Sequence, residues 1–166
     1  MDENSNNFND LGLIPLPSNI EATDSKFQLN EVLYLDLDKQ DQSVKNIVKY
    51  FTKKSNALGF QIKDGNNDIS SLICIKVDKS SSNNEEAYTL KINSEKIEII
   101  GSGYNGFFYG IQTLIQILEI HKINHNSTIH GIIIKDSPRF KWRGLMLDVA
   151  RHMMPIDFIK KCIDII

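Results

Sequence analysis

The residues best suited to chemistry lie close together near the C-terminal end of the sequence. Arg143 precedes an apolar run, Leu145 to Val149, which carries one acid, Asp148, and Arg151 and His152 follow directly. A guanidinium offers a planar fork of donors that suits two hydroxyls or a carboxylate. An ion pair of Arg143 with a nearby acid, or a structural Asp148–Arg151 pair that closes a loop, explains the same residues equally well. The residue types alone leave these alternatives open.

The pattern around these residues predicts the first β-α unit of a parallel-stranded enzyme. Leu145 to Val149 predicts a buried strand, and Pro155 suits the start of a helix over Ile156 to Ile166. In barrels of parallel strands, sites form at the carboxyl ends of the strands, where Asp148 lies, whereas Arg143 stands at the other side. Such a unit needs neighbouring strands, so we expect the chain to be part of something larger.

Gly101 to Gly106 has the G-x-G-x-x-G spacing of a dinucleotide-binding motif. That motif requires a parallel β-α-β unit, whereas the strand before these glycines is predicted to be the second arm of a hairpin. The bulky residues Phe107 and Phe108 also follow the glycines. We therefore favour a sharp glycine-rich turn between sheet and helix over nucleotide binding.

Two other groups of polar residues favour structural explanations. His121, His125 and His130 have no acid or cysteine at ligand spacing, which favours solvated histidines over a metal site. The acidic segments 36–41 and 64–68 are better explained by a strand end and an exposed turn than by calcium binding. No metal site and no cofactor are expected.

The sequence up to residue 137 predicts one α+β unit built around a hairpin. Residues 88–92 alternate apolar and polar side chains, and a second apolar alternation begins at Ile97 after a polar turn. Helices with one apolar face are predicted over 43–57 and 105–120. Further strands are predicted over 27–29, 32–37, 59–64, 72–77 and 128–134, and residues 136–139 are predicted to be a linker.

Bulk properties exclude several classes of protein. The 166 residues are 41% hydrophobic and carry a formal net charge of −2, which gives no electrostatic reason to bind nucleic acid. The length suits one domain and a remnant, and it is too short for a complete barrel of roughly 250 residues. Residues 1–10 lack the pattern of a secretory signal, and no window suits a membrane span. Cys74 and Cys162 are expected to be separate buried thiols.

Residues 136–152 resemble the segment that opens the catalytic barrel of glycoside hydrolase family 20, the β-N-acetylhexosaminidases. Glu86 to Leu90 and Gly106 to Leu114 resemble the hairpin and helix of that family's non-catalytic N-terminal domain. The resemblance implies an α+β fold in which an antiparallel sheet carries helices on one face, followed by the first strand and helix of a truncated (β/α)8 barrel. The implied division is a flexible N-terminus over 1–12, the accessory domain over 13–137 and an incomplete TIM barrel over 138–166.

The resemblance also implies an activity in carbohydrate metabolism. Members of the family are hydrolases that remove terminal β-linked N-acetylglucosamine or N-acetylgalactosamine with retention, using the substrate's acetamido oxygen as nucleophile and no cofactor or metal. Arg143 matches the arginine that hydrogen-bonds sugar hydroxyls, and Asp148, Arg151 and His152 match positions expected to be supporting. The catalytic Asp–Glu pair lies downstream in the family, and Glu85-Glu86 cannot replace it. No residue of this chain is therefore expected to be catalytic, and the chain itself is expected to be inactive.

The implied partner is a terminal N-acetylhexosamine of glycans or chitin-type oligosaccharides, with no nucleic acid and no membrane span. An alternative of another class is a stand-alone binding or interaction module from a truncated relative, and the exposed barrel remnant suits self-association. Nucleotide binding is the third hypothesis. The resemblance suggests a periplasmic, lysosomal or secreted protein, although the sequence shows no signal peptide.

Overall fold

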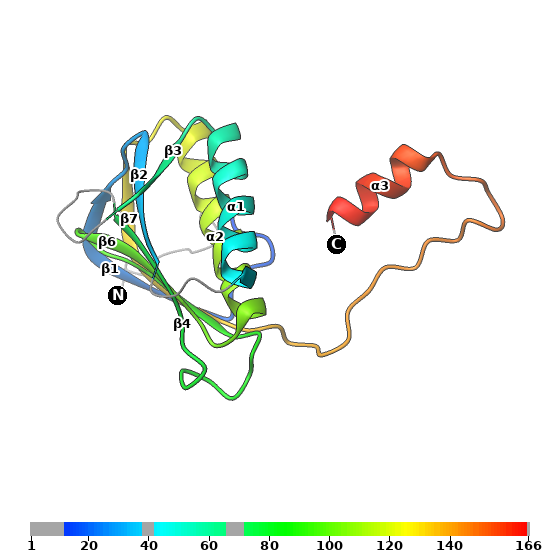
Figure 1. The fold of residues 1–166 in the computed structure, drawn as a ribbon, viewed down its shortest axis with the longest axis horizontal. Coiled ribbons are helices and arrows are strands. Elements are labelled where there is room, and N and C mark those ends of the chain that lie inside the picture. Colours follow the sequence, from blue (N-terminus) through cyan, green and yellow to red (C-terminus); the bar gives the residue numbers. More distant parts are fainter. Residues whose placement is uncertain (1–11, 38–41, 66–71, 166) are drawn as a thin grey trace, which may run out of the picture.

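The computed structural model describes residues 12–37, 42–65 and 72–165. A seven-stranded sheet carries the helices α1 and α2 on one face, and an extended segment then leads away to a third helix, α3 (Figure 1). The strands are β1 (Asn19–Gln28), β2 (Val32–Leu37), β3 (Gln61–Asp64), β4 (Leu72–Val77), β5 (Tyr88–Ile92), β6 (Lys96–Gly101) and β7 (Thr128–Asp136). The helices are α1 (Gln42–Ala57), α2 (Tyr104–Ile123) and α3 (Ile156–Ile165).

The sheet is mixed, so the antiparallel sheet that the resemblance implied is wrong for three of its six strand pairs. The strand order is β1-β7-β5-β6-β4-β2-β3. The pairs β1–β7, β7–β5 and β5–β6 are antiparallel, whereas β6–β4, β4–β2 and β2–β3 are parallel. Parallel neighbours need a long crossover, and the 16-residue helix α1 supplies one between β2 and β3.

The predicted hairpin is confirmed as β5 and β6. Asn93 closes its turn, because its side-chain oxygen accepts two backbone N–H groups, each at 2.9 Å. The inward side chains of both strands face α2 and are buried, as the alternating pattern predicted. These residues are Tyr88, Leu90, Ile92, Ile97 and Ile99.

The two predicted helices of this unit are confirmed as α1 and α2. Gly59 follows α1 with a φ of +88°, a left-handed conformation that favours glycine and ends the helix. α2 packs against β5 and β6 and contributes Phe107, Ile111 and Leu114 to the core, each 0% exposed. The strand β1 begins at Asn19, well before the predicted strand at 27–29, because this edge strand has few apolar residues to reveal it.

The C-terminal segment differs from its prediction. The described part of the chain has no strand at Leu145 to Val149, where the truncated barrel was predicted to begin. A strand exists only if a neighbour pairs with its backbone, and the described sheet ends with β7 in chain order and does not include this segment. The helix predicted after Pro155 is confirmed as α3. Among the described residues, none of the helices has the length and apolar character needed to cross a membrane.

Candidate functional site

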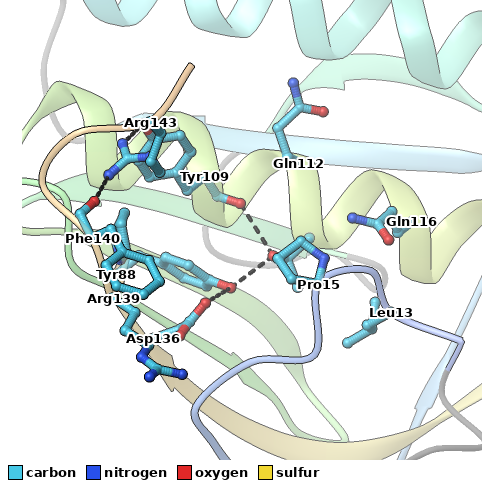
Figure 2. A pocket seen from close by; sticks show the side chains of 12 residues that line it. Leu13, Pro15, Tyr88, Tyr109, Gln112, Gln116, Asp136, Arg139, Phe140 and Arg143 are labelled. Carbon is cyan, nitrogen blue, oxygen red and sulfur yellow. Dashed lines mark hydrogen bonds between the residues drawn. The ribbon is translucent and has the colours of Figure 1, made fainter. Parts of the chain in front are cut away.

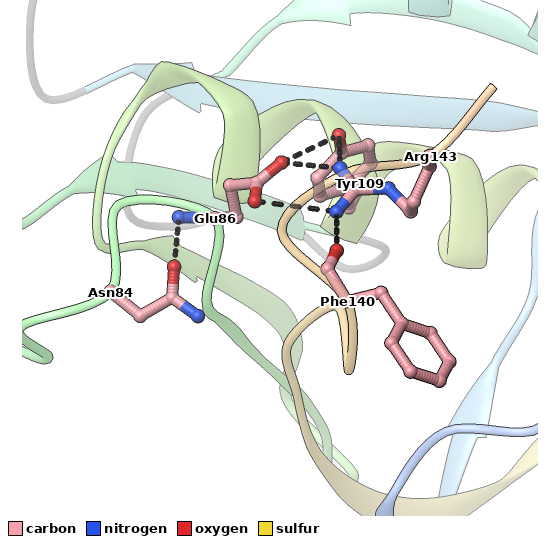
Figure 3. Close-up of polar contacts among 5 residues, drawn as sticks. All are labelled: Asn84, Glu86, Tyr109, Phe140 and Arg143. Carbon is pink, nitrogen blue, oxygen red and sulfur yellow. Dashed lines mark hydrogen bonds and ion pairs between the residues drawn. The ribbon is translucent and has the colours of Figure 1, made fainter.

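Arg143 lies at the centre of a polar cluster that joins the C-terminal segment to the sheet domain (Figure 3). Its Nη2 donates to Glu86 Oε1 at 2.5 Å and to the Tyr109 hydroxyl at 3.0 Å. Its Nη1 donates to Glu86 Oε2 at 3.4 Å and to the carbonyl oxygen of Phe140. The Tyr109 hydroxyl donates to Glu86 Oε1 at 3.1 Å, which completes the Arg143 cluster.

Three separate elements position these groups. Glu86 lies in the turn before β5, where its backbone N–H donates to the Asn84 side chain at 3.0 Å. Tyr109 lies on α2, and its ring is 5.9 Å from the guanidinium carbon. Phe140 and Arg143 belong to the extended segment after β7, and their own contact bends that segment. The cluster therefore depends on the tertiary fold, because its members come from three distant parts of the sequence.

The contact between Arg143 and Glu86 shifts the pKa of both groups in the direction that favours their charged forms. The hydrogen bond from Arg143 lowers the pKa of Glu86, and the same bond raises the pKa of Arg143. The side chains of Arg143 and Glu86 are nevertheless 41% and 24% exposed, respectively, so water screens their attraction. Both side chains are therefore charged at neutral pH, but water competes for the contact between them.

Arg143 thus makes the ion pair with a nearby acid that the residue types left open. Its predicted role as a sugar ligand is not tested by this geometry and stays a prediction. The sequence did not predict Glu86, the residue that pairs with Arg143, as its partner. Nothing in the local sequence indicates the contact, because Glu86 lies 57 residues and Tyr109 34 residues away.

The predicted supporting residues form a local turn of their own. Asp148 pairs with Arg151 through Oδ2 and Nε at 2.7 Å, and its Oδ1 accepts the backbone N–H of Ala150 at 3.1 Å. This is the loop-closing Asp–Arg pair that the sequence left open as an alternative. His152 is exposed. The hydrogen bonds of Asp148 stay within this turn in the described part of the chain, and the supporting role of Asp148, Arg151 and His152 stays a prediction.

A pocket of about 310 Å³ lies beside the Arg143 cluster, where four parts of the chain meet (Figure 2). The N-terminal segment contributes Leu13 and Pro15, α2 contributes Tyr109, Gln112, Thr113 and Gln116, and β5 contributes Tyr88. The end of β7 and the following segment contribute Asp136, Pro138, Arg139, Phe140 and Arg143. Six of its twelve lining residues have polar or charged side chains, and the other six are aromatic or aliphatic.

Several polar groups of this pocket bind other parts of the protein. Gln116 exchanges two hydrogen bonds with the backbone of Ile14, at 2.9 Å and 3.1 Å. The Tyr88 hydroxyl lies 2.7 Å from Thr113 Oγ1 and 3.5 Å from Asp136 Oδ2. Burial raises the pKa of Tyr88 to about 12, so the phenol is neutral at physiological pH. These contacts fasten the ends of β5 and β7 and the N-terminal segment to α2.

The glycine motif is a packing turn, as we favoured from the sequence. An added Cβ at Gly106 would lie 2.0 Å from the carbonyl oxygen of Ala87, so only glycine fits this approach. The N–H of Gly106 donates to the Glu85 carbonyl at 3.1 Å. The backbone of the neighbouring turn therefore occupies the position at the start of α2 that a phosphate would need.

The histidines, the cysteines and the described residues of the two acidic segments considered in the sequence are not part of the Arg143 cluster. His121 bonds the Ile117 carbonyl at 2.9 Å, and His125 and His130 are exposed. Cys74 and Cys162 are half-buried free thiols, and burial raises the pKa of Cys74. Within the described ranges, no three His, Cys, Asp or Glu residues come close enough to hold a metal ion. Of the acidic segments 36–41 and 64–68, residues 38–41 and 66–68 lie outside the described residues.

Two family models from one glycosyl hydrolase family match nearly all of this chain. The family model for glycosyl hydrolase family 20, domain 2, matches residues 10–137, and the model for that family's catalytic domain matches residues 140–166. The β-hexosaminidase of Porphyromonas gingivalis is 35% identical over 163 residues, which is 93% of this chain and 21% of that protein. The β-hexosaminidase of Vibrio furnissii is 31% identical over 93% of this chain and 24% of that protein.

A solved structure gives the same result. The β-N-acetylhexosaminidase from Bacteroides fragilis superposes with a TM-score of 0.72 and 26% identity over 92% of this chain and 30% of that one. The chain therefore spans between 21% and 30% of the length of these three proteins. Because the domain 2 match covers most of the sequence, the chain belongs to glycosyl hydrolase family 20.

Proposed function

We propose that this chain is the N-terminal portion of a retaining β-N-acetylhexosaminidase. In this proposal residues 13–137 form the accessory domain and residues 138–166 begin the catalytic barrel. The observation that carries it is the order of the two family matches, in which domain 2 is followed after two residues by the start of the catalytic domain. The substrate would be a terminal β-linked N-acetylglucosamine or N-acetylgalactosamine.

The proposed chemistry divides between this chain and a downstream region. The acetamido oxygen of the substrate would act as nucleophile, with an adjacent Asp and Glu to orient it and to protonate the leaving group. No Asp–Glu dipeptide follows Arg143 in these 166 residues, so the chain alone would not turn over substrate. Arg143 would bind hydroxyls of the terminal sugar through its planar fork.

Two measurements test the proposal. The purified chain should show no hydrolysis of a chromogenic N-acetyl-β-glucosaminide, and robust turnover would contradict the absence of catalytic groups. Sequencing the source gene beyond the codon for Ile166 should reveal a continuing frame that reaches an adjacent Asp–Glu pair. In the protein made from that frame, Arg143→Lys should raise KM, because an ammonium cannot replace the planar fork.

A second function is favoured by the exposure of apolar residues in the C-terminal segment. Trp142, Met146 and Met153 are 90%, 90% and 94% exposed, which is characteristic of a surface awaiting a partner. If a stop codon follows Ile166, the chain would be an interaction module whose C-terminal segment binds another polypeptide or a second copy. Sedimentation of the purified chain then distinguishes self-association from a monomer.

A further inference from the structure

We infer that Glu86 and Tyr109 are positioning residues that dock Arg143, and with it the segment after β7, onto the sheet domain. Arg143 makes four hydrogen bonds in the cluster, and three of them reach Glu86 and Tyr109. Both terminal nitrogens of the guanidinium are engaged, which is the two-pronged geometry that an arginine offers a carboxylate. Three protein elements position the groups of this cluster, which distinguishes it from a chance surface contact of one long side chain.

The receiving side of this contact is fixed by the fold. Glu86 lies in a turn held by Asn84, and that turn packs against the start of α2 through the Glu85 carbonyl and Gly106. Tyr109 lies one turn further along α2 and also donates to the Glu86 carboxylate. The carboxylate and the hydroxyl thus share a hydrogen bond that does not involve Arg143.

The segment after β7 lies at the pocket described above. Phe140 and Arg143 line the pocket beside Tyr88 and Tyr109, so the contact holds the segment at the edge of the pocket (Figure 2). The Phe140 carbonyl shares Nη1 of Arg143, which bends the segment into this position. Residues beyond Arg143 then leave the sheet domain (Figure 1). The contact therefore sets the direction in which the following residues depart.

The contact with Glu86 and Tyr109 also competes with ligand binding, because both use the terminal nitrogens of Arg143. A pair of sugar hydroxyls would require the terminal nitrogens that now bind Glu86 and Tyr109, and this consequence rests on the proposed function. Because the pair is partly exposed, exchange between the docked and released states is expected to be easy. Glu86 would thus decide how much of the time Arg143 is free for a ligand.

Trp142 provides a direct test, because it is the single tryptophan of the chain and precedes Arg143. Time-resolved fluorescence anisotropy of the purified chain measures how freely this segment moves. Glu86→Gln should increase the amplitude of the fast decay, with a twofold to fivefold fall in the docked-to-released ratio, roughly the range for exposed charge pairs. Arg143→Lys should act in the same direction, because it keeps the charge but loses the fork.

Glu85→Gln is the matched control, since it makes the same charge change one residue away on an exposed side chain. It should leave the anisotropy decay unchanged. Equal decays in Glu86→Gln and Glu85→Gln, or a parent chain in which Trp142 already moves freely, would overturn the inference. Circular dichroism melting verifies that the variants stay folded. The test involves no sugar, so its failure would leave the proposed function standing.

Discussion

In the sheet domain most apolar side chains of β5, β6 and α2 are buried, whereas those of residues 140–163 mostly face solvent. Both regions contain amphipathic patterns of similar quality, and α3 is as clearly periodic as α1. The difference lies in what surrounds each pattern. β5 has β6 and β7 as hydrogen-bonding neighbours and α2 packed against it, while residues 137–155 are not part of the described sheet.

The comparison shows that an apolar pattern produces a strand or a core only when complementary elements are present. Burial removes apolar surface from water and satisfies the backbone through the sheet ladder. The run Leu145 to Val149 has the composition of a buried strand, yet Leu145 is 55% exposed. Four substitutions in the sheet domain test this difference, and they follow in order of decreasing effect on the free energy of unfolding.

Phe107→Ala should cause the largest loss. Phe107 is fully buried in the core beneath α2, so truncation leaves a cavity and should lower the free energy of unfolding by about 3–5 kcal/mol. Trp142→Ala is the counterpart in the C-terminal segment and should change it by less than about 0.5 kcal/mol. Urea unfolding followed by circular dichroism measures both. Similar losses would show that the C-terminal segment packs more than its exposure indicates.

Gly106→Ala should be the next most damaging. Its Cβ would lie 2.0 Å from the Ala87 carbonyl oxygen, which forces α2 away from the turn and should cost about 1–3 kcal/mol. Gly144→Ala is the matched control, since nothing lies within 4 Å of the Cβ it would add. Thermal melts of the two variants should therefore separate. A melting temperature for Gly106→Ala equal to that of the parent would refute the close packing of this turn.

Tyr88→Phe should have a smaller effect that depends on pH. The lost contact to Thr113 should cost about 1 kcal/mol at neutral pH. Because the folded-state pKa is raised to about 12, Tyr88 stabilises the fold below the ordinary tyrosine pKa, and this contribution is lost as pH rises through the window from about 10 to 12.

The parent chain should therefore lose stability faster than Tyr88→Phe across that window, by up to about 1.4 kcal/mol per pH unit. Tyr34→Phe, on the half-buried face of β2, is the control and should keep the parent's pH dependence. Urea midpoints at several alkaline pH values give the comparison. Parallel curves for the parent and Tyr88→Phe would contradict the assignment of the raised pKa.

Glu86→Gln should have the smallest effect on the stability of the sheet domain, with an unchanged urea midpoint at neutral pH. The pair with Arg143 is exposed and tethers a segment that adds little to the core. Since the pKa of Glu86 is lowered, the pair persists below the ordinary glutamate pKa and is lost as pH falls through the lowered value. Acid titration of Trp142 anisotropy should show this loss in the parent and not in Glu86→Gln.

The sequence by itself determined the elements whose pattern is local. The hairpin of β5 and β6, the helices α1, α2 and α3, and the glycine turn before α2 all follow from residue period, turn chemistry and the size of neighbouring side chains. The family resemblance was equally visible in the sequence, because it rests on a contiguous segment around Arg143. Local order of this kind is set by interactions among residues a few positions apart.

Only the tertiary structure decided the rest. The parallel half of the sheet depends on which strands meet after α1, and the length of β1 depends on its pairing with β7. The missing strand at Leu145 to Val149 reflects the lack of a backbone partner among the described residues. The contacts of Arg143 to Glu86 and Tyr109 likewise span 57 and 34 residues. Such pairings are chosen by the packing of the whole sheet domain, which no local pattern in the sequence encodes.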